Sequence, residues 1–426
     1  MGLLKDLKWE GVPDGLTTRD RQPCDYHAYI PDPLVGRPLH LHGQVAARVA
    51  EAEAAIARLQ VEAEQLLNTE TIARLLLRAE SVASSRIEGL EISARKLLRL
   101  QAAREAGEEL QDVTAAEVLG NIDAMVHGIA ISGVGKPISL EALCEVHARL
   151  LAGTRLAAHG GKLRRVQNWI GGSAYSPRGA AFVPPPPEHV EDLCRDLCRF
   201  CDSDDLPAVA QAALAHAQYE TIHPFADGNG RTGRALVHLV LRRRGLVTAV
   251  LPPVSLILAT SSKDYIGGLT ATRYVGPAEA PAAQDGMNLW IERFATACLR
   301  AVDDVGHYRE RATAIRSEWS TRLARVRAGS ASSLLLDLLL SVPVITVHSA
   351  AKMIGRTFPA TNNAVAALVE AGILKQTSLG RRNRAFEAPD VLSAFNALER
   401  RLASPAGDTR MAKPSRRTPA AQKDWL

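Results

Sequence analysis

Apolar residues recur every three or four positions over most of the chain, which is the spacing of an amphipathic helix. The pattern is clearest over residues 41–67 and 71–90, where Ala, Leu, Glu and Arg are abundant and favour helix formation. The same spacing predicts further helices over 93–106, 113–130, 139–152, 188–201 and 207–222. We therefore expect a mainly α-helical protein.

One segment in the middle of the chain departs from the helical pattern. Residues 163–186, LRRVQNWIGGSAYSPRGAAFVPPP, hold two short runs of strand-forming residues on either side of a turn rich in Gly, Ser and Pro. Such runs around such a turn are typical of a β-hairpin. We expect a small hairpin within the helical protein.

The pattern changes again beyond about residue 300. Residues 332–388 predict a helix, a short strand, a helix, a turn, a helix and two β-type runs around LGRRNR. This order resembles a winged helix-turn-helix, with 358–371 as the recognition helix and a basic wing that carries Arg381, Arg382 and Arg384. Basic wings contact phosphates, which favours DNA as a partner. The recognition segment has no Arg or Lys, however, so dimerisation or docking of a protein is an alternative of nearly equal weight.

Residues 221–236, TIHPFADGNGRTGRAL, concentrate polar chemistry in one turn between two predicted helices. Pro224 ends the first helix, and the second begins after the glycines and ends at Gly245. Glycines let the backbone turn its N–H groups toward one point at the positive end of the second helix, which is suited to a phosphate. Arg231 and Arg234 lie three residues apart and can reach the same polyphosphate.

The remaining polar side chains of this stretch complete a set for phosphoryl chemistry. Asp227 is a hard oxygen ligand suited to Mg²⁺, and His223, with an ordinary pKa of about 6.5, is suited to general-base catalysis. ISGVGKPIS at 131–139 lacks the first glycine and the hydroxyl of a P-loop, and GNGRTG follows a helix where a dinucleotide fingerprint needs a strand. An ordinary solvated corner would not explain why base, carboxylate, glycines and cations coincide.

Composition adds mainly exclusions. The chain has 426 residues, is 46% hydrophobic and 23% charged, and carries a net charge of +5, which describes an ordinary globular protein without a strong polyanion preference. We expect no signal peptide, no membrane span and, because Asp6 replaces the required hydroxyl residue, no myristoylation. Six scattered cysteines favour a reducing cytoplasm. Three of them, Cys194, Cys198 and Cys201, share one helical face; a metal site with His189 is less favoured than simple burial.

HPFADGNGRTGR is similar to the signature of the Fic family, HxFx(D/E)GNGRxxR. Every specified position is present, namely His223, Phe225, Asp227, Gly228, Asn229, Gly230, Arg231 and Arg234. YIPDPL near the start resembles the N-terminal segment of one Fic subgroup, and GKLRRVQNWIGG with FVPPPP resembles its substrate-positioning hairpin. The resemblance covers roughly residues 28–300 and implies a Fic-type helical bundle with a hairpin flap.

The resemblance implies transfer of AMP from ATP to a hydroxyl of a protein. His223 would deprotonate that hydroxyl, and Asp227 would hold Mg²⁺. The α-phosphate would lie against Asn229 and the backbone of Gly228 and Gly230, and the outer phosphates against Arg231 and Arg234. Phe225 is expected to anchor the loop in the core. Tyr265 is expected either to cover the adenine or simply to pack.

SVASSRIEGL, residues 81–90, resembles the (S/T)xxxE(G/N) helix that inhibits Fic enzymes, through Ser84, Glu88 and Gly89. Gly89 is a typical helix terminator and so places Glu88 at the negative end of its helix. A carboxylate there costs about 0.3–1 kcal/mol unless a cation meets it. Arg234 is the candidate cation.

The sequence therefore leaves two alternative functions. The first is an autoinhibited protein adenylyltransferase, with removal of AMP as a further activity; the second is a DNA-binding regulator that uses a Fic core only to sense a nucleotide. Expected partners are ATP and a target protein, which can be the chain itself, with DNA and homodimer formation left open. The expected division is an N-terminal region with the inhibitory helix (1–110), a catalytic core (111–300), a connecting helix (301–329), a winged helix-turn-helix domain (330–402) and a disordered tail (403–426).

Overall fold

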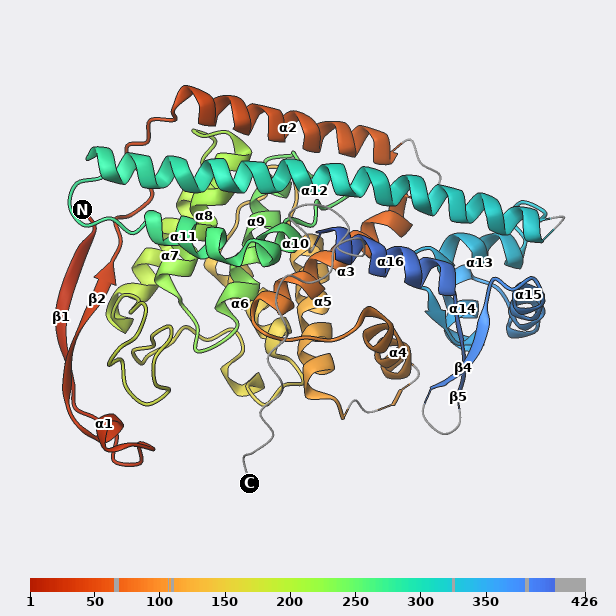
Figure 1. Ribbon diagram of the computed structural model, residues 1–426, viewed down its shortest axis with the longest axis horizontal. Helices are drawn as coiled ribbons and strands as arrows, with labels where there is room; N and C mark the ends of the chain where they lie inside the picture. Colours follow the sequence, from red (N-terminus) through yellow and green to blue (C-terminus); the bar gives the residue numbers. More distant parts are fainter. Residues whose placement is uncertain (65–68, 106, 109–110, 324–325, 380–382, 403–426) are drawn as a thin grey trace, which may run out of the picture.

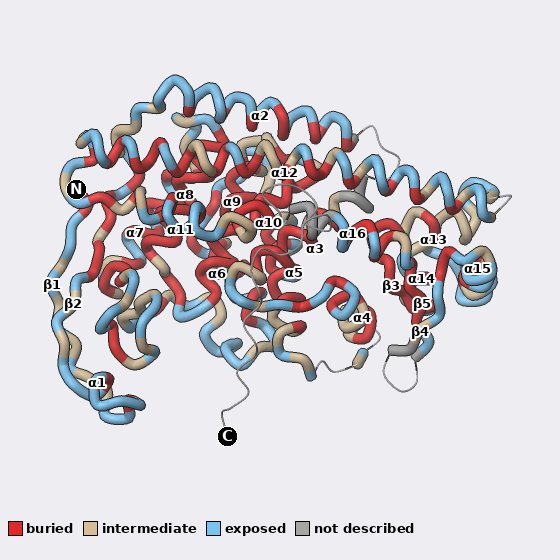
Figure 2. The backbone as a smooth tube through the Cα atoms, viewed as in Figure 1, coloured by how far each residue is buried: buried red, intermediate tan, exposed pale blue. Residues whose placement is uncertain are grey.

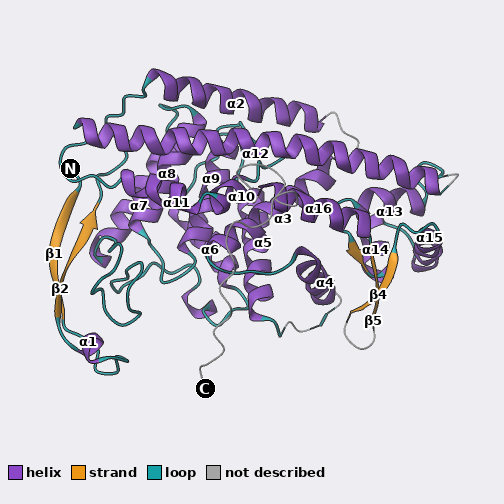
Figure 3. Ribbon diagram, viewed as in Figure 1, coloured by secondary structure: helices purple, strands orange, loops and turns teal. Residues whose placement is uncertain are grey.

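The computed structural model describes residues 1–64, 69–105, 107–108, 111–323, 326–379 and 383–402, and it is mainly helical (Figures 1 and 3). All seven helices predicted before residue 223 are present, with ends within a few residues of those expected. They are α2 (Gly43–Glu64), α3 (Thr69–Ile87), α4 (Ala94–Glu105), α5 (Val113–Ile131), α6 (Leu140–Leu151), α7 (Pro187–Asp202) and α8 (Ala208–Ile222).

The centre of the molecule is the pair formed by α8 and α9 (Asn229–Arg243), which carries the corner between them. Every residue of α8 is buried, which accounts for its lack of an amphipathic pattern (Figure 2). The indole of Trp290 packs against α8 and donates a hydrogen bond to the carbonyl of Ala213 at 2.7 Å. Two short helices, α10 (Val254–Thr260) and α11 (Ser262–Ala271), follow α9. The HPFADGNGRTGR stretch thus lies between two buried helices.

The longest helix, α12 (Pro281–Arg322), runs along one side of the molecule next to α2 and continues toward the C-terminal elements (Figure 1). The boundary expected at residue 300 therefore falls inside a continuous helix. Trp319, near its end, is buried and donates to a carboxylate oxygen of Asp390 at 2.9 Å. One helix thus joins the N-terminal and C-terminal parts of the protein.

The β structure differs from the expectation. Residues 163–186 approach each other but pair only at the bridge between Ile170 and Phe182. Pro184 to Pro187 have no N–H to donate, and the carbonyls of Pro184 and Pro185 accept from the side chains of Gln167 and Arg164 instead. The flap is therefore an irregular loop held by side chains.

An unpredicted antiparallel ribbon forms from β1 (Leu3–Trp9) and β2 (Cys24–Ile30), with Leu3 opposite Ile30. Its connection holds the one-turn helix α1 (Thr18–Arg21). The ribbon joins the flap because the N–H of Tyr29 donates to the carbonyl of Val183 at 2.9 Å.

The C-terminal elements follow the predicted order. They are α13 (Ala331–Leu339), β3 (Val344–Ile345), α14 (Val347–Ile354), α15 (Phe358–Glu370), β4 (Lys375–Leu379), β5 (Asn383–Glu387) and α16 (Pro389–Leu402). The strands form an antiparallel sheet in the order β3-β5-β4. We call residues 331–402 the C-terminal module. Of the wing residues, Arg384 is exposed on β5, whereas Arg381, Arg382 and the predicted tail lie outside the described residues.

The three cysteines expected on one helical face lie together on α7. Cys194, Cys198 and Cys201 are all buried on one face of α7, and burial raises the pKa of the Cys198 thiol to about 12, so simple packing is confirmed for them. Among the helices that the structure describes, none combines the length and the apolar character needed to cross a bilayer.

Candidate active site at the corner between two buried helices

His223 ends α8 in a left-handed conformation, with φ of 49° and ψ of 61°. It is the one non-glycine residue with a positive φ in the described part of the chain. Its N–H donates to the carbonyl of Tyr219 at 2.9 Å, and its carbonyl accepts from Nε of Arg164 at 2.9 Å and from Nδ2 of Asn168 at 3.3 Å. Two flap residues thus hold the histidine in a backbone conformation that is costly for a side chain with a Cβ.

The imidazole of His223 is shielded, with 20% of the side chain exposed. Burial and the nearby Arg164 lower the pKa of His223 to about 4. Its Nδ1 lies 3.9 Å from a carboxylate oxygen of Glu220 and has no hydrogen-bond partner. At neutral pH the ring is therefore uncharged and able to accept a proton.

Glu220 is a buried carboxyl that the sequence did not indicate. It lies one turn before His223 on α8, and its Oε1 has no hydrogen-bond partner. Burial, opposed by Arg234 and reinforced by Glu88, raises the pKa of Glu220 to about 7. The site thus holds a carboxyl and an imidazole that are both biased toward their neutral forms.

Asn229 fixes the loop between the helices. Its Oδ1 accepts from the N–H of Phe225 at 2.8 Å, and its Nδ2 donates to the carbonyl of Phe225 at 2.8 Å. Phe225 is fully buried, as expected for a loop anchor. Both polar groups of the Asn229 side chain are engaged within the loop, so the α-phosphate contact expected for it stays a prediction.

His147, on α6, is a second site residue that sequence reasoning missed. Its ring stacks on Phe225 with centroids 3.7 Å apart and planes 9° apart. Nδ1 accepts from the N–H of Gly161 at 2.9 Å, so the proton is on Nε2, which donates to the carbonyl of Asp227 at 2.9 Å. Burial lowers the pKa of His147 to about 4 and keeps this tautomer neutral. Its apolar helical register, shared with Leu140 and Leu143, was the available signal that it points inward.

Gly228 begins α9 with a positive φ of 73° and no capping side chain. A Cβ at this position would lie 2.8 Å from Cδ2 of Leu150. The glycine therefore permits both the turn and the close packing on α6. The first N–H groups of α9 lie at the positive end of its dipole, as an anion site requires.

Arg231 lies in the first turn of α9 with only 4% of its side chain exposed. Its Nε and Nη1 have no hydrogen-bond partner. The carboxylates of Glu117 and Asp227 are 3.6 and 3.8 Å away, which is too far for a hydrogen bond. A buried guanidinium with unused donors is suited to an anion that enters the site.

Arg234 is fully engaged by α3. Its Nε donates to Oγ of Ser84 at 2.8 Å, and its Nη2 donates to the Ser84 carbonyl at 2.8 Å and to Oε1 of Glu88 at 2.6 Å. Burial disfavours both charges, but their pairing outweighs it, so the pKa of Arg234 is raised and that of Glu88 is lowered. The cation proposed for Glu88 from the sequence is therefore the one that it contacts.

The contact between α3 and α9 repeats every four residues. Glu80 lies 2.9 Å from Nε2 of His238, Ser84 binds Arg234, and Glu88 lies against Gly230. A Cβ on Gly230 would lie 2.0 Å from Oε1 of Glu88. Only glycine therefore lets the carboxylate reach the start of α9. We call this set of three contacts the α3–α9 ladder.

Gly89 ends α3 as the sequence predicted. Its φ is +79°, its N–H donates to the carbonyl of Arg86, and the N–H of Leu90 donates to the carbonyl of Ser85. These two bonds form a Schellman motif, which directs Glu88 to the end of the helix.

Asp227 and Tyr265 lie in opposite surroundings. The Asp227 side chain is 51% exposed at the mouth of the loop, where one carboxylate oxygen can join phosphate oxygens around Mg²⁺. No group of three or more metal-ligating side chains occurs among the described residues. Tyr265 is buried, and its hydroxyl lies 2.8 Å from Nε2 of His216. This burial matches the packing alternative, and contact with adenine stays a prediction.

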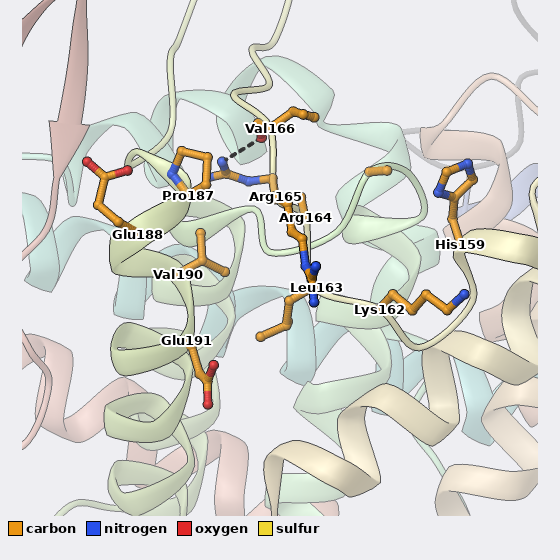
Figure 4. A pocket seen from close by; sticks show the side chains of 11 residues that line it. His159, Lys162, Leu163, Arg164, Arg165, Val166, Pro187, Glu188, Val190 and Glu191 are labelled. Carbon is orange, nitrogen blue, oxygen red and sulfur yellow. Dashed lines mark hydrogen bonds between the residues drawn. The ribbon is translucent and has the colours of Figure 1, made fainter.

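A cavity of about 960 Å³ opens beside the catalytic loop at Ala226, between residues 159–166 and α7. Figure 4 shows His159 and Lys162 on one side of it and Glu188 and Glu191 on α7 on the other. The guanidinium of Arg164 donates to the Val166 carbonyl at 3.1 Å and so fixes the wall between them. The cavity therefore borders the loop that follows His223.

Comparison with known proteins agrees with this geometry. The Fic/DOC family matches residues 137–241, and the Fic/DOC family N-terminal region matches residues 46–130. Protein adenylyltransferase fic-1 of Caenorhabditis briggsae is 32% identical over 155 residues, covering 35% of this chain. Protein adenylyltransferase Fic of Drosophila grimshawi is 36% identical over 140 residues, covering 32% of this chain. The matched segment spans 27% of the length of each of these curated relatives.

Among solved structures, a Fic family protein from Desulfovibrio desulfuricans G20 has the same fold. The superposition has a TM-score of 0.51 at 21% sequence identity and covers 82% of this chain and 97% of that one. The matched segments contain both the helix of Glu88 and the loop of His223. The chain therefore contains a Fic/DOC family domain over residues 137–241, preceded by the N-terminal region of that family over residues 46–130.

Proposed function

We propose that this chain is an autoinhibited protein adenylyltransferase, which transfers AMP from ATP to a hydroxyl of a protein. One observation carries the proposal: a neutral His223 at the end of α8 and a buried Arg231 with unused donors in the first turn of α9 share one corner, while Arg234 is held by Glu88. The names of the curated relatives support the same activity.

The transfer uses the residues as follows. His223 accepts the proton of the target hydroxyl while the oxygen of that hydroxyl bonds to the α-phosphorus of ATP. The bond from that phosphorus to the bridging oxygen breaks, and pyrophosphate leaves with the electron pair. Arg231 and the first N–H groups of α9 stabilise the negative charge, so positioning and electrostatics supply most of the acceleration.

Asp227 would hold Mg²⁺, which when bound neutralises charge on the phosphates. The exposed carboxylate fits that role because Mg²⁺ commonly takes one or two protein oxygens and completes its shell with phosphates and water.

Glu88 obstructs the productive position of ATP. Its carboxylate occupies Arg234 and lies against Gly230, where the outer phosphates of ATP would need to bind. Two anions at this distance repel each other in a shielded site, so ATP binds with its α-phosphorus misaligned. ATP still binds, but transfer of AMP is nearly absent.

The test compares covalent labelling of the chain, at equal concentration with Mg²⁺ and ATP labelled in the α-phosphate. Glu88→Gly should label strongly, and wild type should not. Adding His223→Ala to Glu88→Gly should lower labelling about 10²–10⁴-fold because the general base is lost. Glu91→Gly is the matched control, since Glu91 is exposed three residues further on. Equal labelling of wild type and Glu88→Gly would refute the inhibition, and undiminished labelling of the double variant would refute the role of His223.

Removal of AMP is a separate activity that Glu88 can support by orienting a water molecule. Labelled protein isolated from the Glu88→Gly reaction is added to unlabelled wild type. Release of AMP by wild type, but not by His223→Ala, indicates this reverse reaction. Stable label shows that Glu88 only obstructs.

The DNA-binding alternative has less support. The exposed part of α15 offers no Arg or Lys, and the exposed cations among the described residues around it are Lys352, Arg356, Lys375 and Arg384. DNA, a homodimer, a cytoplasmic location and the identity of the target protein stay predictions. Gel shifts of the full chain at low salt test the first, with loss of binding on added salt expected for phosphate contacts.

A further inference from the structure

A second cavity, of about 430 Å³, lies where α3 meets α5 and the C-terminal module, and none of the residues of the 223–234 loop lines it. Apolar side chains make up most of its wall, among them Leu77 of α3, Ile122 and Val126 of α5, and Val342 and Met353 of the C-terminal module. Its size falls within the range of about 300–1,000 Å³ typical of small-molecule sites. We call it the module cavity.

Charged groups of predominantly one sign line the same cavity. Among the described residues that line it, Arg74, Arg78 and Arg242 are basic and Glu105 is acidic. Arg78 is only 7% exposed; its Nη1 donates to the carbonyl of Ser341 at 2.8 Å and its Nη2 to Gln101 at 3.0 Å. Nε of Arg78 and Nε of Arg242 are buried without a hydrogen-bond partner. An unsatisfied buried donor calls for an acceptor, and a ligand in the cavity is one source of it.

We propose that the module cavity binds a small amphipathic anion, with an apolar body and a single carboxylate or phosphate head. The apolar wall would take the body, and the unused donors of Arg78 and Arg242 would take the head. Arg78 and Arg242 place positive charge beside the apolar wall, which favours an anionic head group over a cationic one. The residues of the cavity take no part in the transfer reaction.

Because α3 forms part of its wall, the module cavity can affect the position of α3. Leu77 and Arg78 lie on the same helix as Ser84 and Glu88, and a helix of ten residues is about 15 Å long. The module cavity has its present walls only while α3 is docked between α9 and the C-terminal module. An anion that binds it therefore stabilises the docked helix, and by linkage it holds Glu88 on Arg234. This coupling to inhibition rests on the proposed function, but binding at the cavity does not.

The experiment measures binding by isothermal titration calorimetry with the full chain and sodium decanoate, using decanol as the uncharged comparison. We expect one decanoate per chain and at least tenfold weaker binding of decanol. Val126→Trp, which fills the mouth of the cavity from a half-exposed position, should abolish binding. Val113→Trp, at a similarly exposed position of the same helix, is the matched control and should bind normally.

A charge variant separates the head group from the apolar body. Arg242→Gln should weaken decanoate about tenfold, as expected for one charge-assisted hydrogen bond, whereas the exposed Arg58→Gln should not. No binding by wild type, equal binding of decanol, or unchanged binding by Val126→Trp overturns the site. A chain that transfers no AMP would still pass or fail this test, because the readout is heat of binding.

Hydrogen exchange tests the coupling. Decanoate should slow amide exchange over residues 73–88 of wild type, including the last turn of α3, and leave β1 unchanged. In Val126→Trp it should have no effect. Protection confined to the C-terminal module would overturn the link to α3.

Discussion

Arg234 is a fully buried cation whose hydrogen bonds are supplied almost entirely by α3. A charge in that position is tolerated only while its donors are satisfied, since an unmet donor retains its full desolvation cost. Ser84 supplies two of the acceptors, and Glu88 supplies the third. Ser84 is therefore as much a part of the inhibitory contact as Glu88, although it carries no charge.

Ser84→Ala should lower the free energy of unfolding by about 1–3 kcal/mol, because Nε of Arg234 loses its acceptor inside the protein. Ser81→Ala is the matched control, since Ser81 is equally buried on α3 but its hydroxyl donates only to the carbonyl of Leu77. It should cost less than about 1 kcal/mol. Urea unfolding measures both, and equal losses would show that the Ser84 hydroxyl adds nothing to the burial of Arg234.

The site residues within HPFADGNGRTGR could be identified because they are close together in the chain, whereas Ser84 and Glu88 were identified through the family resemblance. His223, Asp227 and Arg231 fall within one short stretch, so their proximity follows from the chain itself. His147, Glu220 and Asn168 escaped notice for two reasons. His147 and Asn168 reach the loop only through the packing of other elements, whereas Glu220 is near in sequence but gains its raised pKa only from burial.

At the scale of elements, helix ends were predictable because caps and breakers are local. Gly89 closes α3 and Pro224 follows α8, and each leaves a signature in the sequence. The β1–β2 ribbon was missed because Ala28 and Tyr29 are the only buried residues of its two strands, so the strands carry little of the apolar pattern that indicates a strand. The flap lost its predicted pairing because side-chain donors took the carbonyls of its prolines.

The α4 helix is clamped to the C-terminal module through Glu387. Arg95 contacts one carboxylate oxygen at 2.6 Å, Arg99 contacts the other, and Nη2 of Arg99 donates to Thr377 at 2.7 Å. The Glu387 side chain is 2% exposed, and the two cations outweigh its burial, so its pKa is lowered. The carboxylate thus depends on both arginines for its charge.

Replacing Arg95 and Arg99 together by Ala should destabilise the protein by about 2–3 kcal/mol. This is below the about 3–5 kcal/mol of a fully buried pair because Arg95 is half exposed to water. Adding Glu387→Gln should restore part of the loss, since the uncompensated charge disappears. Thermal unfolding of the double and triple variants checks this, and a triple variant less stable than the double one would contradict the clamp.

At the scale of the whole molecule, several ionisable groups are buried in their neutral forms. His147, His216 and His223 have pKa values lowered to about 4, 3 and 4, mainly by burial. Glu220 has a pKa raised to about 7 in the same core. The histidines and the carboxyl therefore act on stability with opposite signs as the pH falls.

Whether stability rises or falls with pH depends on how many protons the folded and the unfolded protein bind. Between pH 6.5 and 5 the unfolded chain protonates all three histidines, whose ordinary pKa is about 6.5, while the folded protein keeps them neutral. At these histidines the unfolded chain therefore binds about three protons more than the folded protein, so acidification favours unfolding. The folded protein keeps Glu220 protonated where the unfolded chain ionises it, which offsets about one of these. The net of about two protons predicts that stability falls by about 3 kcal/mol per pH unit near pH 5.5.

Urea unfolding at several pH values between 6.5 and 5 measures this slope, and Glu220→Gln isolates the offset. Because glutamine cannot bind the compensating proton, the variant should lose stability more steeply on acidification, by about 1 kcal/mol more per pH unit. Glu91→Gln is a suitable control, since Glu91 is exposed on the surface of the protein. A slope that Glu220→Gln leaves unchanged would mean that Glu220 is ionised in the folded protein. In that case Arg234, which already holds Glu88, would also have to stabilise a second carboxylate inside the core.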